Sequence, residues 1–175
     1  MMAVGKPLGI RNAGCYTLES LRIEKGYPRM GLELTPFINP YQAGLEDRID
    51  KKESDFIGKK ALLDLESEPV YKRLVFIALE EHDYNCIPWG GEPIFRDGKI
   101  VGVTSSASMS FSLDTPICMG YVTNEGNGVT KEYIESGRFE IDVAGQRFPA
   151  KAALHKVTEK PMEAFLNKVF QSNSK

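Results

Sequence analysis

The feature of this sequence that most constrains its fold is a change of hydrophobic periodicity after Pro69. Leu74–Leu79 is a continuous apolar run of strand length, which is typical of a strand buried on both faces or nearly so. Further along the chain, short segments alternate apolar and polar residues and are separated by turn residues. Five or six short antiparallel strands at this spacing predict a small barrel or sandwich.

The clearest turn in this region is Asp97-Gly98, which lies between two apolar arms and supplies the two positive-φ positions of a tight hairpin. Thr130 is predicted to open a short helix that ends at Gly137. The other predicted strands cover Ala107–Phe111, whose apolar residues alternate with serines, Ile117–Val122, Phe139–Val143 and Phe148–Leu154. We therefore expect an antiparallel β-barrel of about six strands in residues 69–160.

The residues before this barrel have helical character. Ile10, Ala13, Leu18 and Leu21 follow helical spacing with one face turned inward, and Asn12 is a plausible cap. Ser54 is predicted to cap a second amphipathic helix. Between them, three prolines break residues 27–45 into an irregular segment whose Phe37 should be buried, and long irregular connections are usually functional.

The predicted fold is α+β, with a helical N-terminal portion followed by a small antiparallel C-terminal β-barrel. We divide the chain into residues 1–68, the barrel at 69–160, and a terminal helix or tail at 161–175, where an amphipathic pattern begins at Pro161.

Ser20–Gly26 carries the most distinctive charges of the N-terminal portion. Lys25 and Gly26 are typical of the C-terminal end of a helix, so Arg22 and Glu24 are expected in its last turn, just before a tight glycine turn. Two interpretations remain open. Arg22 either forms a surface ion pair with Glu19 or Glu24, or offers its planar guanidinium to a carboxylate or the polar edge of a heterocycle.

Composition excludes several classes of function. The net charge of -2, with basic and acidic residues interleaved, gives no case for nucleic acid or an anionic membrane as partner. No segment approaches the roughly 20 apolar residues of a membrane span, and the first residues are neither a signal peptide nor a presequence. Two distant histidines and three scattered cysteines predict no metal site. Cys86 near His82 lacks an elbow motif for nucleophilic catalysis, and the serine hydroxyls of the Ala107–Phe111 strand are expected to face water or an enclosed surface.

Several blocks of the chain resemble the aminomethyltransferase family, which comprises the glycine-cleavage T-protein and the tails of dimethylglycine and sarcosine dehydrogenases. The likeness covers nearly the whole chain in the right order. Its blocks are Gly9–Gly14, Ser20–Gly26, Gly31–Leu34, Pro40–Leu45, Asp55–Leu62, Gly98–Ser106 and Gly120–Val122.

The resemblance implies a binding site for tetrahydrofolate. Arg22 matches the family arginine that contacts the folate or its substrate adduct, and Glu24 belongs to the same block. Met30 stands where the family usually carries an aromatic residue that walls the pterin, and methionine is a softer platform. Arg22, Met30 and Glu24 are therefore the candidate ligand-binding residues, and no catalytic residue is assigned.

Within the family, Val70–Leu74, Pro88–Ile94 and Tyr133–Leu154 are similar to the branch of non-catalytic regulatory subunits of pyruvate dehydrogenase phosphatase. That branch implies the mitochondrial matrix and a phosphatase catalytic subunit as partner. The alternative is the tail of a flavin-linked demethylase that passes a one-carbon unit to tetrahydrofolate, with its flavin on the N-terminal half. In both cases we expect a missing N-terminal part carrying the family's catalytic aspartate, so that this fragment alone is not catalytic.

Overall fold

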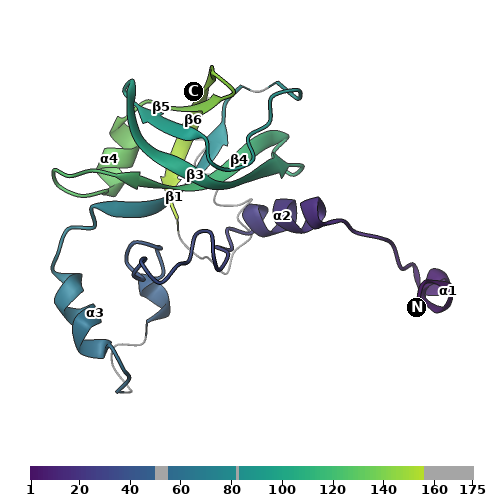
Figure 1. Cartoon of the computed structure of the whole chain (residues 1–175), viewed down its shortest axis with the longest axis horizontal. Helices are drawn as coiled ribbons and strands as arrows, with labels where there is room; N and C mark the ends of the chain where they lie inside the picture. The colour runs from purple at the N-terminus through teal and green to yellow at the C-terminus, as the bar shows by residue number, and fades with distance from the viewer. Residues whose placement is uncertain (50–54, 82, 156–175) are drawn as a thin grey trace, which may run out of the picture.

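The computed structural model describes residues 1–49, 55–81 and 83–155 of the chain. The predicted cap Ser54, the histidine His82 and the predicted terminal helix from Pro161 lie outside the described residues. Figure 1 shows a barrel with the N-terminal elements on one side of it, and residues 1–14 extend away from the body of the molecule.

The barrel is closed and wholly antiparallel, which confirms the predicted fold class. Its strand order is β1-β4-β3-β2-β5-β6, and β6 returns to pair with β1, for example at Val75 and Leu154. The hairpin turn at Asp97 and Gly98 has the predicted positive φ values of 51° and 78°. The strands are β1 (Lys72–Leu79), β2 (Pro93–Arg96), β3 (Lys99–Ser110), β4 (Thr115–Thr123), β5 (Phe139–Val143) and β6 (Gln146–Leu154).

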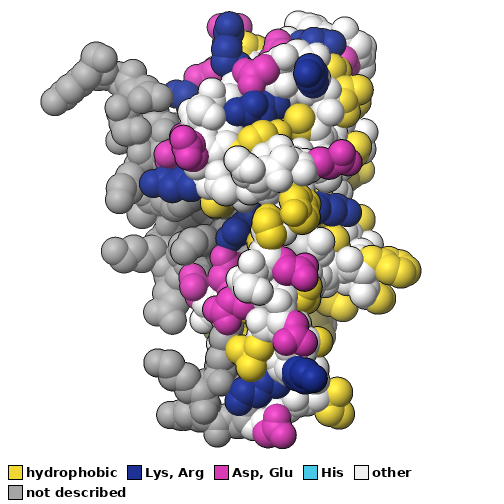
Figure 2. All heavy atoms as spheres, turned by 90° about the vertical axis from the view of Figure 1, so that its left-hand side faces the viewer, with side chains coloured by type: hydrophobic (Ala, Val, Ile, Leu, Met, Phe, Trp, Pro, Cys, Tyr) yellow, Lys and Arg dark blue, Asp and Glu magenta, His cyan; other side chains and the backbone are white. Residues whose placement is uncertain are grey.

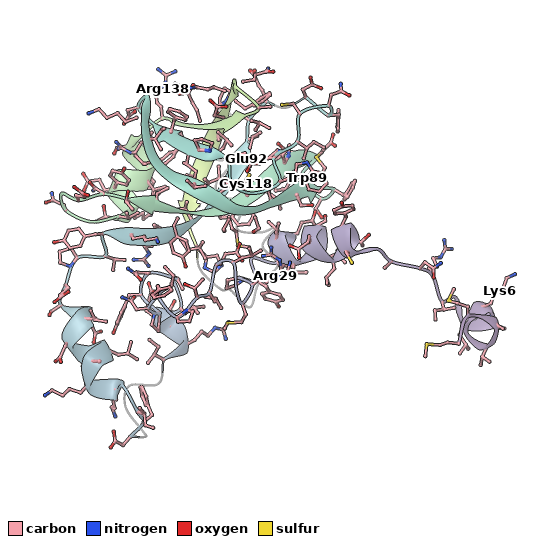
Figure 3. The ribbon with its side chains drawn as sticks, in the orientation of Figure 1. Lys6, Arg29, Trp89, Glu92, Cys118 and Arg138 are labelled. Atoms are coloured by element: carbon pink, nitrogen blue, oxygen red, sulfur yellow. The ribbon has the colours of Figure 1, made fainter. Side chains whose placement is uncertain are left out.

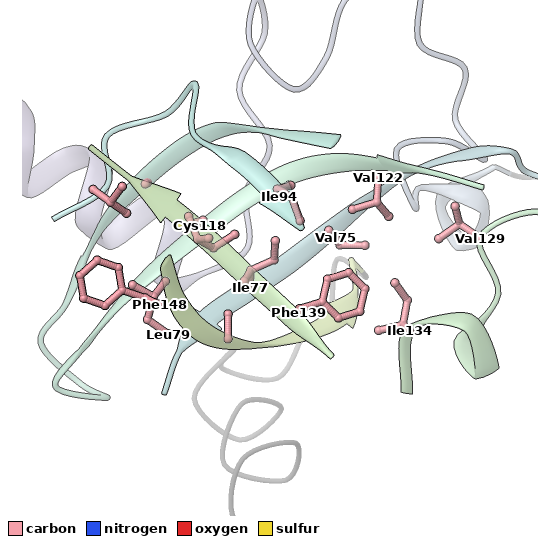
Figure 4. Close-up of a cluster of buried hydrophobic side chains, with 14 residues drawn as sticks. Val75, Ile77, Leu79, Ile94, Cys118, Val122, Val129, Ile134, Phe139 and Phe148 are labelled. Atoms are coloured by element: carbon pink, nitrogen blue, oxygen red, sulfur yellow. The ribbon is translucent and has the colours of Figure 1, made fainter. Parts of the chain in front are cut away.

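The apolar run of β1 is continuous because both faces of this strand are covered. Its odd-numbered residues, such as Val75 and Ile77, join the inner cluster that fills the barrel (Figure 4). Its even-numbered residues, such as Leu74 and Phe76, join an outer cluster that Ile23 of the N-terminal portion completes. Side chains of a strand alternate between its faces, so only a strand buried on both sides needs an unbroken apolar sequence.

A short helix, α4 (Lys131–Ser136), closes one end of the barrel. Thr130 caps it as predicted, because its hydroxyl oxygen accepts a hydrogen bond from the Tyr133 N–H over 3.1 Å. Val129 and Ile134 complete the inner cluster at this end (Figure 4). One prediction for the strands is wrong: β3 ends at Ser110, so Phe111 lies exposed in the following turn instead of on the buried face.

Within residues 1–49 and 55–68, the described part of the N-terminal portion, there are three α-helices and two 3-10 helices. They are α1 (Met2–Gly5), η1 (Lys6–Leu8), α2 (Cys15–Glu24), η2 (Glu46–Arg48) and α3 (Lys59–Glu66). Helix α2 lies beside β3 and β4 (Figure 1) and buries Ser20 and Ile23 there.

Two details of the predicted first helix are wrong. It begins at Cys15 with Gly14 as its cap, instead of at Ile10 with Asn12. Leu18 and Leu21, expected on the buried face, are exposed on the opposite side, because α2 packs through Ser20 and Ile23. Its predicted stop is confirmed, with Lys25 as the C-terminal cap and Gly26 at a φ of 68°.

Residues 27–45 form the expected irregular segment, with turns and one isolated bridge between Met30 and Leu34. Phe37 is almost fully exposed, contrary to the prediction that it would be buried. Figure 2 shows basic and acidic side chains interspersed on the α3 side of the molecule. Among the described helices, none has the length and apolar character that crossing a membrane requires.

Candidate functional site

The guanidinium of Arg22 is surrounded by acceptors from its own chain. Nε and Nη2 donate to Glu19 Oε2 over 3.0 and 2.6 Å. Nη1 donates to the Tyr27 carbonyl over 3.1 Å and to Glu33 Oε2 over 3.3 Å. The side chain is only 11% exposed. The ion pair with Glu19 that the sequence left open is therefore present, but it is part of a partly buried network.

At the centre of that network lies Glu33, whose side chain is fully buried. Ser105 and Ser106 donate their hydroxyl protons to Oε1 over 2.7 and 2.6 Å. The Arg29 backbone N–H donates to Oε2 over 2.8 Å, beside Arg22. Burial by itself raises the pKa of Glu33, but these hydrogen bonds and the charge of Arg22 hold it below its ordinary value. Glu33 is thus a buried carboxylate that stays ionised.

The two serines reach one carboxylate because β3 contains a bulge. Opposite β4, Thr104 pairs with Gly120 and Ser106 pairs with Met119, which leaves Ser105 as an extra residue. Successive side chains of a regular strand point to opposite faces, and a bulge changes that alternation locally. From the sequence, the Ser106 hydroxyl was expected to face water or an enclosed surface, and no prediction was made for Ser105 or for the carboxylate that both serines bind.

Glu24, the last residue of α2, bonds the same end of the helix to the barrel. Its Oε1 accepts from the Ser110 hydroxyl over 2.7 Å and from the Ser112 N–H over 3.1 Å, and its Oε2 accepts from the Ser112 hydroxyl over 3.2 Å. Ser20, one turn earlier, donates to the Met109 carbonyl over 2.8 Å. Partial burial opposes ionisation, yet the serine hydrogen bonds lower the pKa of Glu24. Glu24 thus bonds to β3 and the turn after it, and Arg22 bonds to Glu19 and Glu33.

Met30 lies at the surface and is 74% exposed. It belongs to the turn that begins at Arg29, whose N–H donates to the Glu33 carboxylate. Gly31 N–H donates to the Leu34 carbonyl over 2.8 Å, and Leu34 N–H donates to the Arg29 carbonyl over 3.0 Å. Of the three candidate residues, Arg22 and Met30 are thus linked through Glu33 and this turn, whereas Glu24 faces the serines of β3.

An exposed aromatic pair lies near the start of α2. The rings of Tyr16 and Trp89 meet edge to face, with centroids 5.2 Å apart. Glu92 fixes the loop that carries Trp89, because its carboxylate accepts from the N–H groups of Trp89 and Gly90 over 2.6 and 2.9 Å. Figure 3 shows Trp89 close to Glu92 on the α2 side of the barrel. No role was predicted for Trp89 from the sequence.

A buried histidine forms a second tie between residues 26–44 and the barrel. His155 Nε2 lies 2.7 Å from the Gly26 carbonyl and Nδ1 lies 3.1 Å from the Ala43 carbonyl. Gly44 is required beside it, because a Cβ there would lie 2.3 Å from the His155 carbonyl oxygen. Burial lowers the pKa of His155, against the opposing effect of the two carbonyls and of the Glu33 and Glu46 charges.

No nucleophilic or metal-binding constellation occurs in the part of the chain that the structure describes. Its His, Cys, Asp and Glu side chains form no group that could hold a metal ion. Cys86 donates its thiol proton to the Val143 carbonyl over 3.5 Å, and burial raises the pKa of Cys118. Around the end of α2, the described residues thus bring together the carboxylates of Glu33 and Glu24 and the guanidinium of Arg22, groups that suit binding and orientation.

Comparison with known proteins agrees with the arrangement of these elements. Residues 1–53 match the model of the GCVT N-terminal domain, and residues 72–158 match the glycine cleavage T-protein C-terminal barrel domain. The chain belongs to the aminomethyltransferase, or glycine-cleavage T-protein, family. The aminomethyltransferase T of Bartonella henselae has the same fold, with a TM-score of 0.67 at 23% identity over 91% of this chain and 42% of that one.

Longer members of the family are also similar in sequence. The mitochondrial pyruvate dehydrogenase phosphatase regulatory subunit of Mus musculus is 46% identical over 167 residues, which are 90% of this chain and 19% of that protein. The mitochondrial dimethylglycine dehydrogenase of Homo sapiens is 35% identical over 151 residues, 86% of this chain and 16% of that protein. This aminomethyltransferase-family chain thus spans less than a fifth of either relative.

Proposed function

We propose that this chain is the C-terminal part of a non-catalytic regulatory subunit that acts on pyruvate dehydrogenase phosphatase by protein contact in the mitochondrial matrix. The observation that carries the proposal is the 46% identity to such a subunit across 90% of the chain, against 35% to a dimethylglycine dehydrogenase. A protein contact needs a stable scaffold and no reactive group, which fits the described residues.

The contacts of Arg22 support a regulatory role over catalysis. Arg22 directs Nε, Nη1 and Nη2 at its own chain, so little of its hydrogen-bonding capacity is left for a ligand. Met30 adds a flexible, exposed side chain in place of an oriented aromatic wall. Catalysis depends on rigidly preoriented groups, so the flexible Met30 side chain favours a protein that has kept the fold without the reaction.

The test uses the full-length protein and the phosphatase catalytic subunit. We expect co-purification of the two and a change in phosphatase activity, with no heat of binding when tetrahydrofolate is titrated into the full-length protein. Tight tetrahydrofolate binding together with failure to engage the catalytic subunit would contradict the proposal.

A second candidate is the tail of a flavin-linked enzyme that transfers a one-carbon unit to tetrahydrofolate. It is favoured by the family membership. The resemblance noted in the sequence further implies that Arg22, Met30 and Glu24 contact folate. Here the full-length protein should contain bound flavin, and Arg22→Glu should abolish folate affinity while the barrel stays folded. A full-length protein without flavin or folate affinity excludes this candidate.

We also propose that a preceding part of the same polypeptide covers the outer face of α2. Leu18 and Leu21 lie one turn apart on this face, and both are exposed. Residues 1–14 leave the body of the molecule (Figure 1), with Val4 and Leu8 also exposed. The relatives are several times longer than this chain. In the full-length protein, amides of α2 should exchange with solvent more slowly than in the isolated chain, and equal rates would contradict this packing.

A further inference from the structure

We infer that the bulge of β3 forms a carboxylate-binding seat, and that Glu33 occupies this seat as the positioning residue for Arg22. The seat is defined by the hydroxyls of Ser105 and Ser106, the backbone N–H of Arg29 and the Nη1 group of Arg22. The existence of the seat does not depend on the proposed function. Only the importance of Arg22 to a ligand or partner rests on it.

The seat offers donors to both oxygens of a carboxylate. Oε1 lies 2.7 and 2.6 Å from the two serine hydroxyls, and Oε2 lies 2.8 Å from the Arg29 nitrogen and 3.3 Å from Arg22 Nη1. The Ser105 hydroxyl also lies 3.0 Å from the Met119 carbonyl, so its single proton has two acceptors within reach. An ionised carboxylate accepts at both oxygens and donates nothing, which matches these donors.

An amide of the same shape does not satisfy the seat equally well. Its NH2 group would face either the serines or the two fixed donors of Arg29 and Arg22. The serine hydroxyls can rotate to accept a proton, but the Arg29 N–H and the guanidinium cannot. Since a buried donor without an acceptor is costly, the seat should distinguish a carboxylate from its amide.

Glu33 positions Arg22 because one side chain joins three elements. Its carboxylate connects the bulge of β3 to α2, through Arg22, and to the turn that carries Met30, through the Arg29 N–H. Its backbone carbonyl accepts a hydrogen bond from the Tyr121 hydroxyl of β4 over 2.9 Å. Burial raises the pKa of Tyr121, so this hydroxyl keeps its proton. Both ends of the residue are thus fixed to the barrel.

Chemical rescue separates a carboxylate seat from a merely structural buried acid. Glu33→Ala should empty the seat and lower the thermal midpoint of the chain. Sodium formate should then restore stability in proportion to the logarithm of its concentration, as expected for a ligand that binds only the folded state. Sodium chloride at the same ionic strength is the control for salt, and Glu33→Gln, which fills the seat, should not respond to formate.

The serines and Glu19 provide matched controls. Adding Ser105→Ala and Ser106→Ala to the Glu33→Ala chain should remove the response to formate. Glu19→Gln loosens Arg22 from its other side without emptying the seat, so it should be insensitive to formate. Proton exchange at the Arg22 guanidinium, followed by NMR, should speed up at least about tenfold in Glu33→Ala and slow again with formate.

Several outcomes would overturn the inference. They are an equal response of Glu33→Ala and Glu33→Gln to formate, an equal effect of chloride, or Arg22 proton exchange that formate leaves unchanged. If Glu33→Ala does not fold, titration of the Glu33 carboxyl in the Ser105→Ala, Ser106→Ala chain decides, because its pKa should rise above that in the unaltered chain. Failure of the full-length protein to engage the phosphatase would reject the proposed function and leave these results intact.

Discussion

The barrel and the N-terminal portion of this chain are held in place by different kinds of interaction. The barrel closes its hydrogen-bonded sheet around an apolar cluster that includes Val75, Ile77 and Ile141, all fully buried. Helix α2 places a single fully buried apolar side chain, Ile23, against the barrel. Its other ties are polar: Arg22 bonds to Glu33, Glu24 bonds to the serines at the end of β3, and Ser20 donates to the Met109 carbonyl.

This difference has a physical consequence. Apolar burial is non-directional and insensitive to pH, whereas a buried carboxylate depends on its ionisation and on each of its donors. The barrel should therefore tolerate conditions that release α2 and the turn carrying Met30. Because hydrogen bonds are directional, the polar contacts of Glu33 and Glu24 also fix the orientation of α2 relative to the barrel.

The largest expected effect is in the inner cluster. Ile77→Ala should lower the free energy of unfolding of the whole chain by about 4 kcal/mol, because it leaves a cavity among residues that cannot fully collapse into it. Urea denaturation followed by circular dichroism measures this. Ile100→Ala, at an exposed barrel position, is the control and should change the value by less than about 1 kcal/mol. Equal losses would refute the central role of the inner cluster.

Glu33→Ala tests the polar attachment. Removing a buried, fully hydrogen-bonded carboxylate beside Arg22 should cost about 3 kcal/mol, because the serines and the guanidinium lose their acceptor. Hydrogen exchange should quicken in α2 and the turn that carries Met30, while the amides of β1 keep their protection. Glu135→Gln, which removes only an exposed pair with Lys131, is the matched control. Loss of protection across β1 would show that the two regions unfold together.

As the pH falls, the N-terminal portion should detach from the barrel before the barrel itself unfolds. The pKa of Glu33 in the folded chain lies below the ordinary value of 4.5, so its contribution to stability is present above that pH. It is lost as the pH falls through 4.5 towards the folded-state pKa. Hydrogen exchange of α2 and the barrel at a series of pH values measures the difference.

His155 adds an earlier step of the same sign. Its folded-state pKa is below 6.5, so stability declines as the pH falls below 6.5, where the unfolded chain takes up a proton first. His155→Asn should remove this step and leave the one near pH 4.5. Glu33→Gln should reduce that second step without abolishing it, because the pKa of Glu24 is also lowered in the folded chain. If the amides of the barrel lose their protection from hydrogen exchange at the same pH as those of α2, the two regions do not separate as the pH falls.

The smallest effect concerns the exposed aromatic pair. Trp89→Ala should lower stability by less than about 1 kcal/mol, because Trp89 is 66% exposed and touches Tyr16 only edge to face. Thermal denaturation measures this, with Phe111→Ala, another exposed aromatic, for comparison. A loss as large as that of Ile77→Ala would show that Trp89 belongs to the structural core.

Most of the barrel could be predicted from the sequence, because its signals are local. The unbroken apolar run of β1, the Asp97-Gly98 turn and the Thr130 cap each act within a few residues. The limits of α2 were less predictable. Leu18 and Leu21 carry a convincing helical pattern, but a pattern does not reveal which side of the helix has a partner.

The candidate site divides in the same way. The sequence pointed to Arg22, Met30 and Glu24, and their roles toward a ligand remain predictions. Glu33 and the two serines of the bulge were missed, because they lie about 70 residues apart and no local pattern joins them. The signals in the sequence that could have pointed to this contact were weak: Glu33 is an acidic residue in a proline-rich segment, and Ser105 and Ser106 are adjacent serines in a predicted strand region.

The sequence by itself determined the strands, the turns and the family of this protein, since periodicity, turn residues and motif order are properties of neighbouring residues. Only the tertiary structure decided that the charged groups at the end of α2, Arg22 and Glu24, form their hydrogen bonds and ion pairs within the chain. A one-residue bulge at Ser105 turns two hydroxyls onto Glu33, and Glu33 in turn holds Arg22. Such a contact depends on the register of a closed barrel, which is set by all of its strands at once.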